Sequence, residues 1–407
     1  MLLRYNTSSN FLRNKSLIFL IIARMSTTIA SQMLTVAVGW QIYSITKDPF
    51  YLGLVGLVQF LPMLLLTLVV GHAADRYNRK VIVCTSLIVE GVGIFLLALG
   101  SFHGWISKER ILLFIFFIGT AGAFQGPPMQ ALLPNIVTKE VFPRATALMS
   151  SVSEFTVIIG PSLGGFLYSL GPGTVYSISG SLIMLASILI FFIVLKSEQT
   201  KPDPATLKSL FAGITFIKSR PIILGAISLD LFAVLFGGAT ALLPIFAGEI
   251  LKIGASGLGI LRSAPAAGAL LMSAMLAKKP LNRKAGRIMF TAVIFFGMST
   301  IVFALSKSFL LSLGALFVLG ASDVISVVIR STLVQTQTPD NMRGRVSAVN
   351  LMFIGTSNQL GEFESGLTAS WFGAKNAALI GGIGTILVVL LWMRLFPQIL
   401  KVEKLQQ

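Results

Sequence analysis

The chain has 407 residues, of which 55% are hydrophobic and only 12% are charged. Soluble domains usually carry about 25% charged residues, so this composition cannot build a water-facing surface and predicts a membrane protein. The formal net charge of +17 comes from Lys and Arg in short clusters between apolar runs. That pattern is typical of loops facing anionic lipid, not of a nucleic-acid groove. A single cysteine, Cys84, excludes an intrachain disulfide, and no His/Cys spacing predicts a metal site or cofactor.

Apolar runs long enough to cross the hydrocarbon core, about 20 residues each, occur twelve times along the chain. The expected spans are 16–45, 50–74, 79–101, 109–133, 143–170, 174–195, 221–249, 256–277, 286–306, 308–335, 345–370 and 375–396. The longest polar segment divides them six and six. We therefore expect an N-terminal half at 1–195, a cytoplasmic linker at 196–220 that is partly an amphipathic helix, and a C-terminal half at 221–407.

Loop charges orient these spans. If the N-terminus is cytoplasmic, most of the 32 Lys and Arg residues fall in cytoplasmic segments. The outer loops then hold only Lys47, Lys108, Arg110, Lys252, Lys307 and Lys375. Basic residues are enriched in cytoplasmic loops, so both termini are expected in the cytoplasm.

Matching residues recur at equivalent positions in the two halves. Asn78-Arg79-Lys80 after the second span matches Asn282-Arg283-Lys284 after the eighth, and Gly160 and Gly165 match Gly361 and Gly366. We interpret these matches as an internal duplication. Duplicated six-helix halves favour a binding cavity near the midplane and rocking of one half against the other.

The loop after the second span carries a family signature. It reads Gly71-His-Ala-Ala-Asp75-Arg76-Tyr-Asn-Arg79-Lys80 and resembles the loop 2–3 motif of the major facilitator superfamily, Gly-x-x-x-Asp-Arg-x-x-Arg-Arg/Lys. The resemblance covers essentially the whole chain. It implies an all-α membrane fold of twelve helices in two pseudo-symmetric halves, and a secondary transporter rather than an enzyme. The second-half copy is degenerate, because Lys279 stands at the position equivalent to Asp75.

This signature predicts a cytoplasmic gate. Asp75 can accept hydrogen bonds at a facing helix N-terminus or pair with an arginine, and the duplication puts Arg343 and Arg345 nearby. Gly71 permits close backbone approach. Arg76, Arg79 and Lys80 are either gate partners or only inside-positive charges that anchor lipid.

The fifth span contains Gly160-Pro161-Ser-Leu-Gly164-Gly165, which resembles the Gly-Pro-x-x-Gly-Gly core associated with antiporters of this superfamily. Pro161 removes a helical hydrogen bond, and the glycines allow tight contact. We expect that contact to be with a helix of the other half, sealing the cavity. The alternative is plain glycine packing without a coupling role.

Two further stretches narrow the resemblance. One is Val38-Gly-Trp40-Gln-Ile-Tyr43 with Asp48-Pro49 and Leu52-Gly53. The other is Thr338-Pro-Asp-Asn-Met-Arg343-Gly-Arg345 with Gly361-Glu-Phe-Glu-Ser-Gly366. Both are similar to the branch of enterobactin exporters and macrolide efflux proteins. The branch implies a monomer in the bacterial inner membrane that exchanges protons for a small amphipathic substrate.

Ionisable residues inside the spans are functional candidates, because a charge at the bilayer centre costs at least about 2.5–3.5 kcal/mol. The proton-coupling candidates are Asp230, Asp323 and Glu154, since a carboxyl removed from water binds a proton more readily. Arg24 and Arg330 either bind an anionic substrate group or hold a carboxylate. Permanent interhelical ion pairs are the alternative for each carboxylate. The remaining substrate candidates are Gln32, Gln59, Gln125, Trp40 and Phe236.

Two functions remain open. The first is proton-coupled export of small amphipathic molecules, of drug or siderophore type, by alternating access. The second is import, or transport of lipid or lysolipid, on the same fold.

Overall fold

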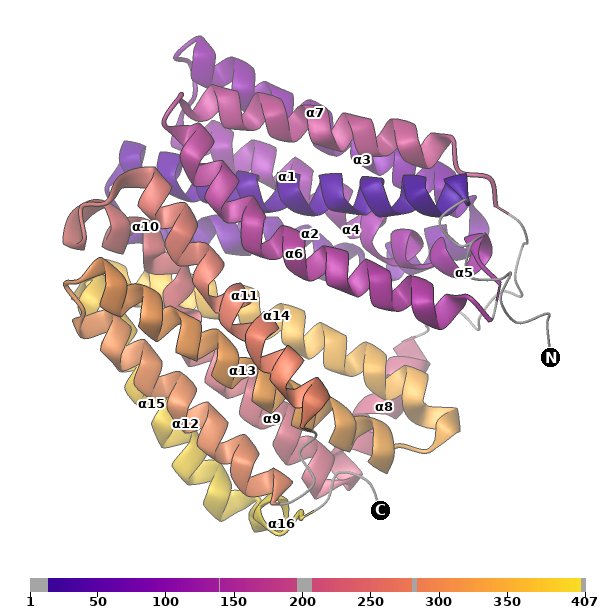
Figure 1. Ribbon diagram of the computed structural model, residues 1–407, viewed down its shortest axis with the longest axis vertical. Helices are drawn as coiled ribbons and strands as arrows, with labels where there is room; N and C mark the ends of the chain where they lie inside the picture. Colours follow the sequence, from indigo (N-terminus) through magenta and orange to yellow (C-terminus); the bar gives the residue numbers. More distant parts are fainter. Residues whose placement is uncertain (1–13, 139, 196–206, 280–283, 404–407) are drawn as a thin grey trace. The chain divides into compact units, whose positions relative to one another are not determined.

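The computed structural model describes residues 14–138, 140–195, 207–279 and 284–403, and this part of the chain is helical without a β-strand (Figure 1). Contacts divide the chain into two compact units. The first unit comprises residues 1–41 and 58–204, and the second comprises 42–57 and 205–407. Each unit is described here by itself.

The N-terminal helices follow the expected spans. They are α1 (Lys15–Thr46), α2 (Pro49–Arg76), α3 (Arg79–Phe102), α4 (Lys108–Gln130), the short α5 (Leu133–Ile136), α6 (Phe142–Tyr168) and α7 (Pro172–Phe191). Local chemistry sets their starts. Asn78 accepts a hydrogen bond from the Lys80 backbone N–H at 2.9 Å and caps α3. Gly171, with φ of 100°, turns the chain into α7. α3 packs against both α4 and α7.

The C-terminal helices are α8 (Leu207–Ser219), α9 (Pro221–Phe236), α10 (Leu243–Ile245), α11 (Gly254–Lys278), α12 (Ala285–Leu305), α13 (Phe309–Gln337), α14 (Asp340–Phe372), α15 (Ala374–Leu395) and α16 (Pro397–Leu400). α12 packs between α13 and α15 (Figure 1). α11 and α13 meet through reciprocal glycine contacts, Gly268 on the Phe317 carbonyl and Gly320 on the Pro265 carbonyl. Small residues that let helix backbones approach are typical of membrane packing.

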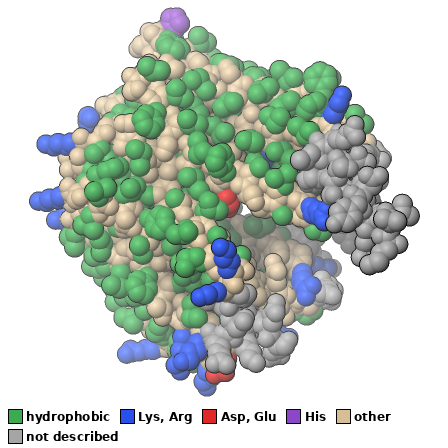
Figure 2. All heavy atoms as spheres, in the orientation of Figure 1, with side chains coloured by type: hydrophobic (Ala, Val, Ile, Leu, Met, Phe, Trp, Pro, Cys, Tyr) green, Lys and Arg blue, Asp and Glu red, His purple; other side chains and the backbone are tan. Residues whose placement is uncertain are grey.

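Eleven helical stretches in the described part of the chain are long and apolar enough to cross a membrane. α14, with 33 residues, is long enough to be the twelfth, but its charged residues lower its apolar character. Figure 2 shows hydrophobic side chains spread over the visible face. Leu310 is 75% exposed and Leu65 is 66% exposed. Such a surface suits a lipid solvent, not water.

The seventh span departs from the expected regular helix. After α9 the chain passes through a 3-10 segment, η1 (Gly238–Leu242), then α10, and then a π-helical segment, η2 (Phe246–Ile250). Gly238 lies directly against the Gly361 carbonyl of α14, which leaves no space for a side chain. The irregularity therefore coincides with a close backbone approach.

A helix, α8, lies in the second part of the predicted linker. α8 packs on α14, where a Cβ added at Gly213 would lie 2.9 Å from the Arg345 carbonyl oxygen. Residues 196–206 of the predicted linker lie outside the described residues.

Candidate functional site

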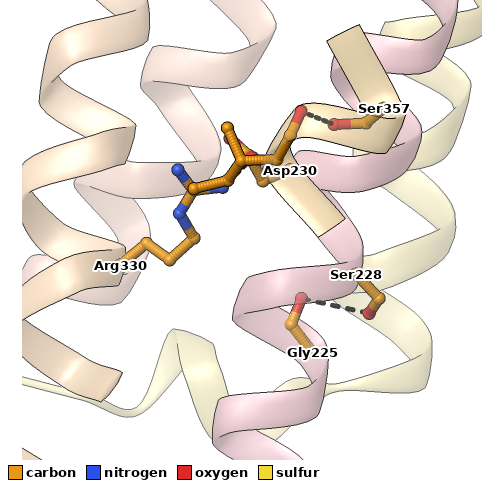
Figure 3. A network of polar contacts seen from close by, with 6 residues as sticks. Gly225, Ser228, Asp230, Arg330 and Ser357 are labelled. Atoms are coloured by element: carbon orange, nitrogen blue, oxygen red, sulfur yellow. Dashed lines mark hydrogen bonds and ion pairs between the residues drawn. The ribbon is translucent and has the colours of Figure 1, made fainter. Parts of the chain in front are cut away.

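Two charged side chains meet in the interior of the C-terminal unit. Asp230 is on α9 and Arg330 is on α13, and a guanidinium nitrogen of Arg330 forms an ion pair with Asp230 Oδ2 (Figure 3). The two side chains are only 8% and 4% exposed. The pair therefore offsets two charges that would each be costly if buried alone.

The site is held by the packing of α9. Ser228, two residues before Asp230, accepts a hydrogen bond from Trp392 Nε1 of α15 at 3.0 Å. Thr385 of α15 donates to the Ala233 carbonyl at 3.2 Å. The apolar cluster around this face includes Leu229, Phe290 and Val389 among its buried members. Asp230 is therefore fixed from behind by α15 while its carboxylate points to α13.

A small cavity of about 10 Å³, with room for about one water molecule, lies beside the pair. Its lining residues are Asp230, Ala233, Val234, Val293, Phe296, Ser322, Asp323 and Ser326. Asp323 has neither a hydrogen bond nor an ion pair with any residue that the structure describes. The cavity thus joins one paired carboxylate to one unpaired carboxyl.

The charge count of this site decides what it can do. Two ionised carboxylates and one guanidinium carry a net charge of −1, and one bound proton makes the cluster neutral. Because Arg330 already offsets Asp230, a proton that enters the cavity is expected on Asp323. Ser322 and Ser326 place hydroxyl groups in the same cavity and can donate to a carboxylate or a water.

Asp323 and Arg330 are seven residues apart and therefore lie on one helix face, but the sequence did not identify which carboxylate Arg330 would hold. The structure pairs Arg330 with Asp230, so the ion-pair alternative applies to Asp230 and not to Asp323. Sequence reasoning also missed Ser322, Ser326 and Phe296. The i, i+3 and i+7 spacing of Asp323, Ser326 and Arg330 was the available signal.

The third carboxyl candidate, Glu154, is exposed on α6. Its expected role in proton coupling stays a prediction.

The candidate polar and aromatic residues are spread over several helices. Arg24, Gln32 and Trp40 are partly buried on α1, and Trp40 meets Tyr168 edge to face at 6.4 Å. Gln59 and Gln125 are also partly buried, on α2 and α4. Phe236 instead packs against Gly384 of α15, and Phe296 rather than Phe236 lines the cavity.

The fifth-span glycines lie against α1. A Cβ at Gly160 would lie 2.6 Å from the Gln32 Cβ, and one at Gly164 would lie 2.8 Å from the Met33 Cα. Both partners are on α1 of the same unit, so these two close contacts lie within the N-terminal unit, and the contact expected with the other half stays a prediction. α6 continues as a helix through Pro161, and Gly165 is buried.

The gate residues are only partly described. Gly71 and Asp75 lie on α2, and the surroundings of both residues are outside the described part of the structure. Arg76 is exposed, Arg79 begins α3, and Arg345 is exposed on α14. Arg343 donates from Nε to the Gln335 carbonyl at 3.3 Å.

Lys80 has a local function of its own. Its ammonium donates to the Ile193 carbonyl at 3.0 Å and lies 5.3 Å from the centre of the Phe191 ring. A cation at this position satisfies backbone carbonyl groups just beyond the end of α7. Lys80 therefore fastens α3 to α7.

Comparison with known proteins also indicates a membrane transporter. The family model described as Major Facilitator Superfamily matches residues 20–362. The enterobactin exporter EntS of Citrobacter koseri is 27% identical over 386 residues, covering 93% of this chain and 91% of that protein. EntS of Shigella boydii is 26% identical over 374 residues, covering 90% of this chain and 84% of that protein.

Solved transporter structures share the fold at low identity. A bacterial homologue of the lysosomal transporter Spinster, in an inward-facing unoccupied conformation, aligns with a TM-score of 0.73 at 16% identity over 95% of this chain and 96% of its own. The nucleoside transporter NupG aligns with a TM-score of 0.70 at 16% identity over 94% and 99%. With the helical architecture and the family match together, the chain belongs to the major facilitator superfamily and is a multi-pass membrane transporter, not an enzyme.

Proposed function

We propose that this transporter exports small amphipathic molecules, of drug or siderophore type, in exchange for protons by alternating access. The observation that carries the proposal is the cavity in which Asp323 lies unpaired beside the Asp230–Arg330 ion pair. The similarity to enterobactin exporters over nine-tenths of the chain supports the substrate class and the direction.

The site supplies a two-state charge. With a proton on Asp323 the cluster is neutral, and without it the cluster carries one negative charge among apolar groups such as Val293 and Phe296. A buried net charge is costly, so the ionised state favours a conformation in which water reaches the cavity. Alternating protonation can therefore bias the two conformations of a transport cycle.

The substrate would be recognised largely outside this cluster. Gln32, Gln59 and Gln125 offer hydrogen-bonding amides, and Trp40 and Arg24 offer an aromatic face and a cation. These groups suit a ligand with both aromatic and polar parts. The cytoplasmic gate would use Asp75 with Arg343 and Arg345, with both termini in the cytoplasm of a bacterial cell.

Reconstitution into liposomes tests the proposal. Vesicles that contain the protein are given a pH gradient with the acidic side inside. Enterobactin, a macrolide or a lysolipid is then added, and the pH inside the vesicles is followed with a trapped dye. Proton movement that depends on enterobactin or the macrolide is the expected result. Movement that depends only on the lysolipid would favour the lipid-transport alternative, and substrate flux without proton movement would contradict the coupling.

A further inference from the structure

A polar cluster in the C-terminal unit takes no part in the site described above. Gln359 and Glu362 lie three residues apart on α14 and therefore share one face of that helix. Gly56, from the N-terminal part of α2, groups with this unit and lies against both side chains. A Cβ added at Gly56 would lie 2.8 Å from Glu362 Oε2 and 3.2 Å from Gln359 Oε1. Two acceptor oxygens thus lie over the bare backbone of a glycine.

Neither oxygen has a donor among the residues that the structure describes. The Gln359 oxygen is buried and has no hydrogen-bond partner there. The Glu362 carboxylate interacts electrostatically with Arg262 of α11, but the two side chains form neither a hydrogen bond nor an ion pair. Because a buried acceptor without a donor is costly, the cluster favours an occupant that supplies donors.

The α14 backbone beside this cluster is held by contacts with two other segments. The Gly361 carbonyl lies directly against Gly238 of η1, and a Cβ at Gly366 would lie 2.6 Å from the Gly53 nitrogen. Glycines at these contacts let the backbones approach closely. The polar side chains are therefore carried by a firmly packed helix, as a binding site requires.

The polar groups define what an occupant must offer. Glu362 and Gln359 oxygens accept hydrogen bonds, and Arg262 donates them. The charges of Arg262 and Glu362 cancel, so an ion of either sign would leave a net charge in the cluster. The matching occupant is a neutral group that donates to the two oxygens and accepts from the guanidinium. A hydroxyl group does both, and two neighbouring hydroxyls supply one donor for each oxygen.

The cluster is also accessible. Arg262, Gln359 and Glu362 each keep part of their surface exposed. A permanent ion pair between Arg262 and Glu362 would need no further partner, but the two side chains do not form one. These observations favour a site for a ligand group over a finished structural contact.

We propose that Gln359, Glu362 and Arg262 form a subsite that binds hydroxyl groups of the transported molecule. The subsite deepens the function proposed above by adding a specificity contact on the C-terminal unit. It rests on that function only in taking the chain as a carrier of amphipathic molecules, and proton coupling at Asp323 is not part of it. Gln359 and Glu362 are the specificity-determining residues, and the missing side chain of Gly56 leaves their oxygens uncovered.

Two matched ligands and two pairs of variants test the subsite. Purified protein in detergent is titrated with dihydroxycoumarin and with dimethoxycoumarin, whose ether oxygens cannot donate, and binding is measured by equilibrium dialysis. The unmodified protein should bind dihydroxycoumarin at least about tenfold more tightly. Gln359→Met and Glu362→Gln should each lower that preference severalfold. The exposed control variants Gln398→Met and Glu403→Gln should leave it unchanged.

The ratio of the two affinities separates recognition from misfolding, because unfolded protein lowers the binding capacity for both ligands alike. The proposal is overturned if dihydroxycoumarin does not bind, if the unmodified protein binds both ligands equally, or if the preference survives both substitutions. Binding needs no proton gradient. A failure of the coupling proposed for Asp323 would therefore leave the subsite standing, and a failure of the subsite would leave that coupling unaffected.

Discussion

Each unit holds a carboxyl group that has no cation partner among the described residues, and the surroundings of the two groups differ. Asp323 of the C-terminal unit faces a cavity that it shares with an ion pair and two serine hydroxyls. Glu90 of the N-terminal unit is 7% exposed on α3, which packs against α4 and α7, and its Oε2 has no hydrogen-bond partner among the described residues.

Burial of a carboxyl group alone therefore does not define a proton-coupling site. A proton carrier must exchange its proton with water, and a cavity beside it provides the path. Asp323 lines such a cavity. The described ion pair and its neighbouring carboxyl lie in the C-terminal unit, whereas the N-terminal unit holds Arg24, Glu90 and Glu154 on three different helices.

The largest effect should follow from removing the carboxyl of Asp323. Asp323→Asn is expected to lower transport driven by a pH gradient by roughly a hundredfold, because the site loses its exchangeable proton. Substrate exchange without a gradient should persist. Transport assays in proteoliposomes check both, with Glu109→Gln at the start of α4 as a matched carboxyl control. If Asp323→Asn carries out gradient-driven transport at the normal rate, Asp323 and Glu90 do not differ in function.

The next effect concerns stability. Arg330→Met leaves Asp230 buried and unpaired, which is expected to cost about 3–5 kcal/mol of unfolding free energy. The double variant Asp230→Asn with Arg330→Met should recover most of that loss. Denaturation in detergent measures all three proteins. If the double variant is as unstable as the single one, the ion pair is not what matters at this position.

Glu90 provides the converse test. Glu90→Gln keeps the shape and removes a charge that lacks a hydrogen-bond partner at Oε2, so transport should be unchanged and stability should rise by about 1 kcal/mol. Thermal unfolding and the same transport assay give the two readouts. A transport defect as large as that of Asp323→Asn would mean that the N-terminal unit also carries coupling protons.

The smallest effect should come from Lys80. Lys80→Met removes the hydrogen bond to the Ile193 carbonyl and the contact with the Phe191 ring, at a cost of about 0.5–1 kcal/mol. Unfolding measurements should detect this loss, with Arg76→Met as the exposed control. Equal losses in both variants would indicate a general charge effect instead of a specific attachment.

Much of the fold was predictable because membrane spans are set by length and hydrophobicity. Span boundaries agreed with the helices within a few residues, apart from the irregular end of the seventh span. That irregularity depends on Gly238 approaching Gly361, a contact that periodicity does not encode. α14 was also predicted, although its charges make it the least apolar of the long helices.

The site was predictable by residue type but not by pairing. The cost of intramembrane charge singled out Asp230, Asp323 and Arg330 together with Glu154 and Arg24, and the structure brings the first three together. Which carboxylate Arg330 holds depends on the crossing of α9 and α13, which no local pattern fixes. The same limitation applies to Gly160 and Gly164. The sequence predicted that these glycines make close contacts, but it did not predict that α1 would be the partner helix.

Infrared difference spectroscopy of the carboxyl groups tests the central claim most directly. A protonated-carboxyl band that appears and disappears on pH change or substrate addition should be present in the unmodified protein and in Glu90→Gln, and absent in Asp323→Asn. The same band in Asp323→Asn, or its loss only in Glu90→Gln, would contradict the account.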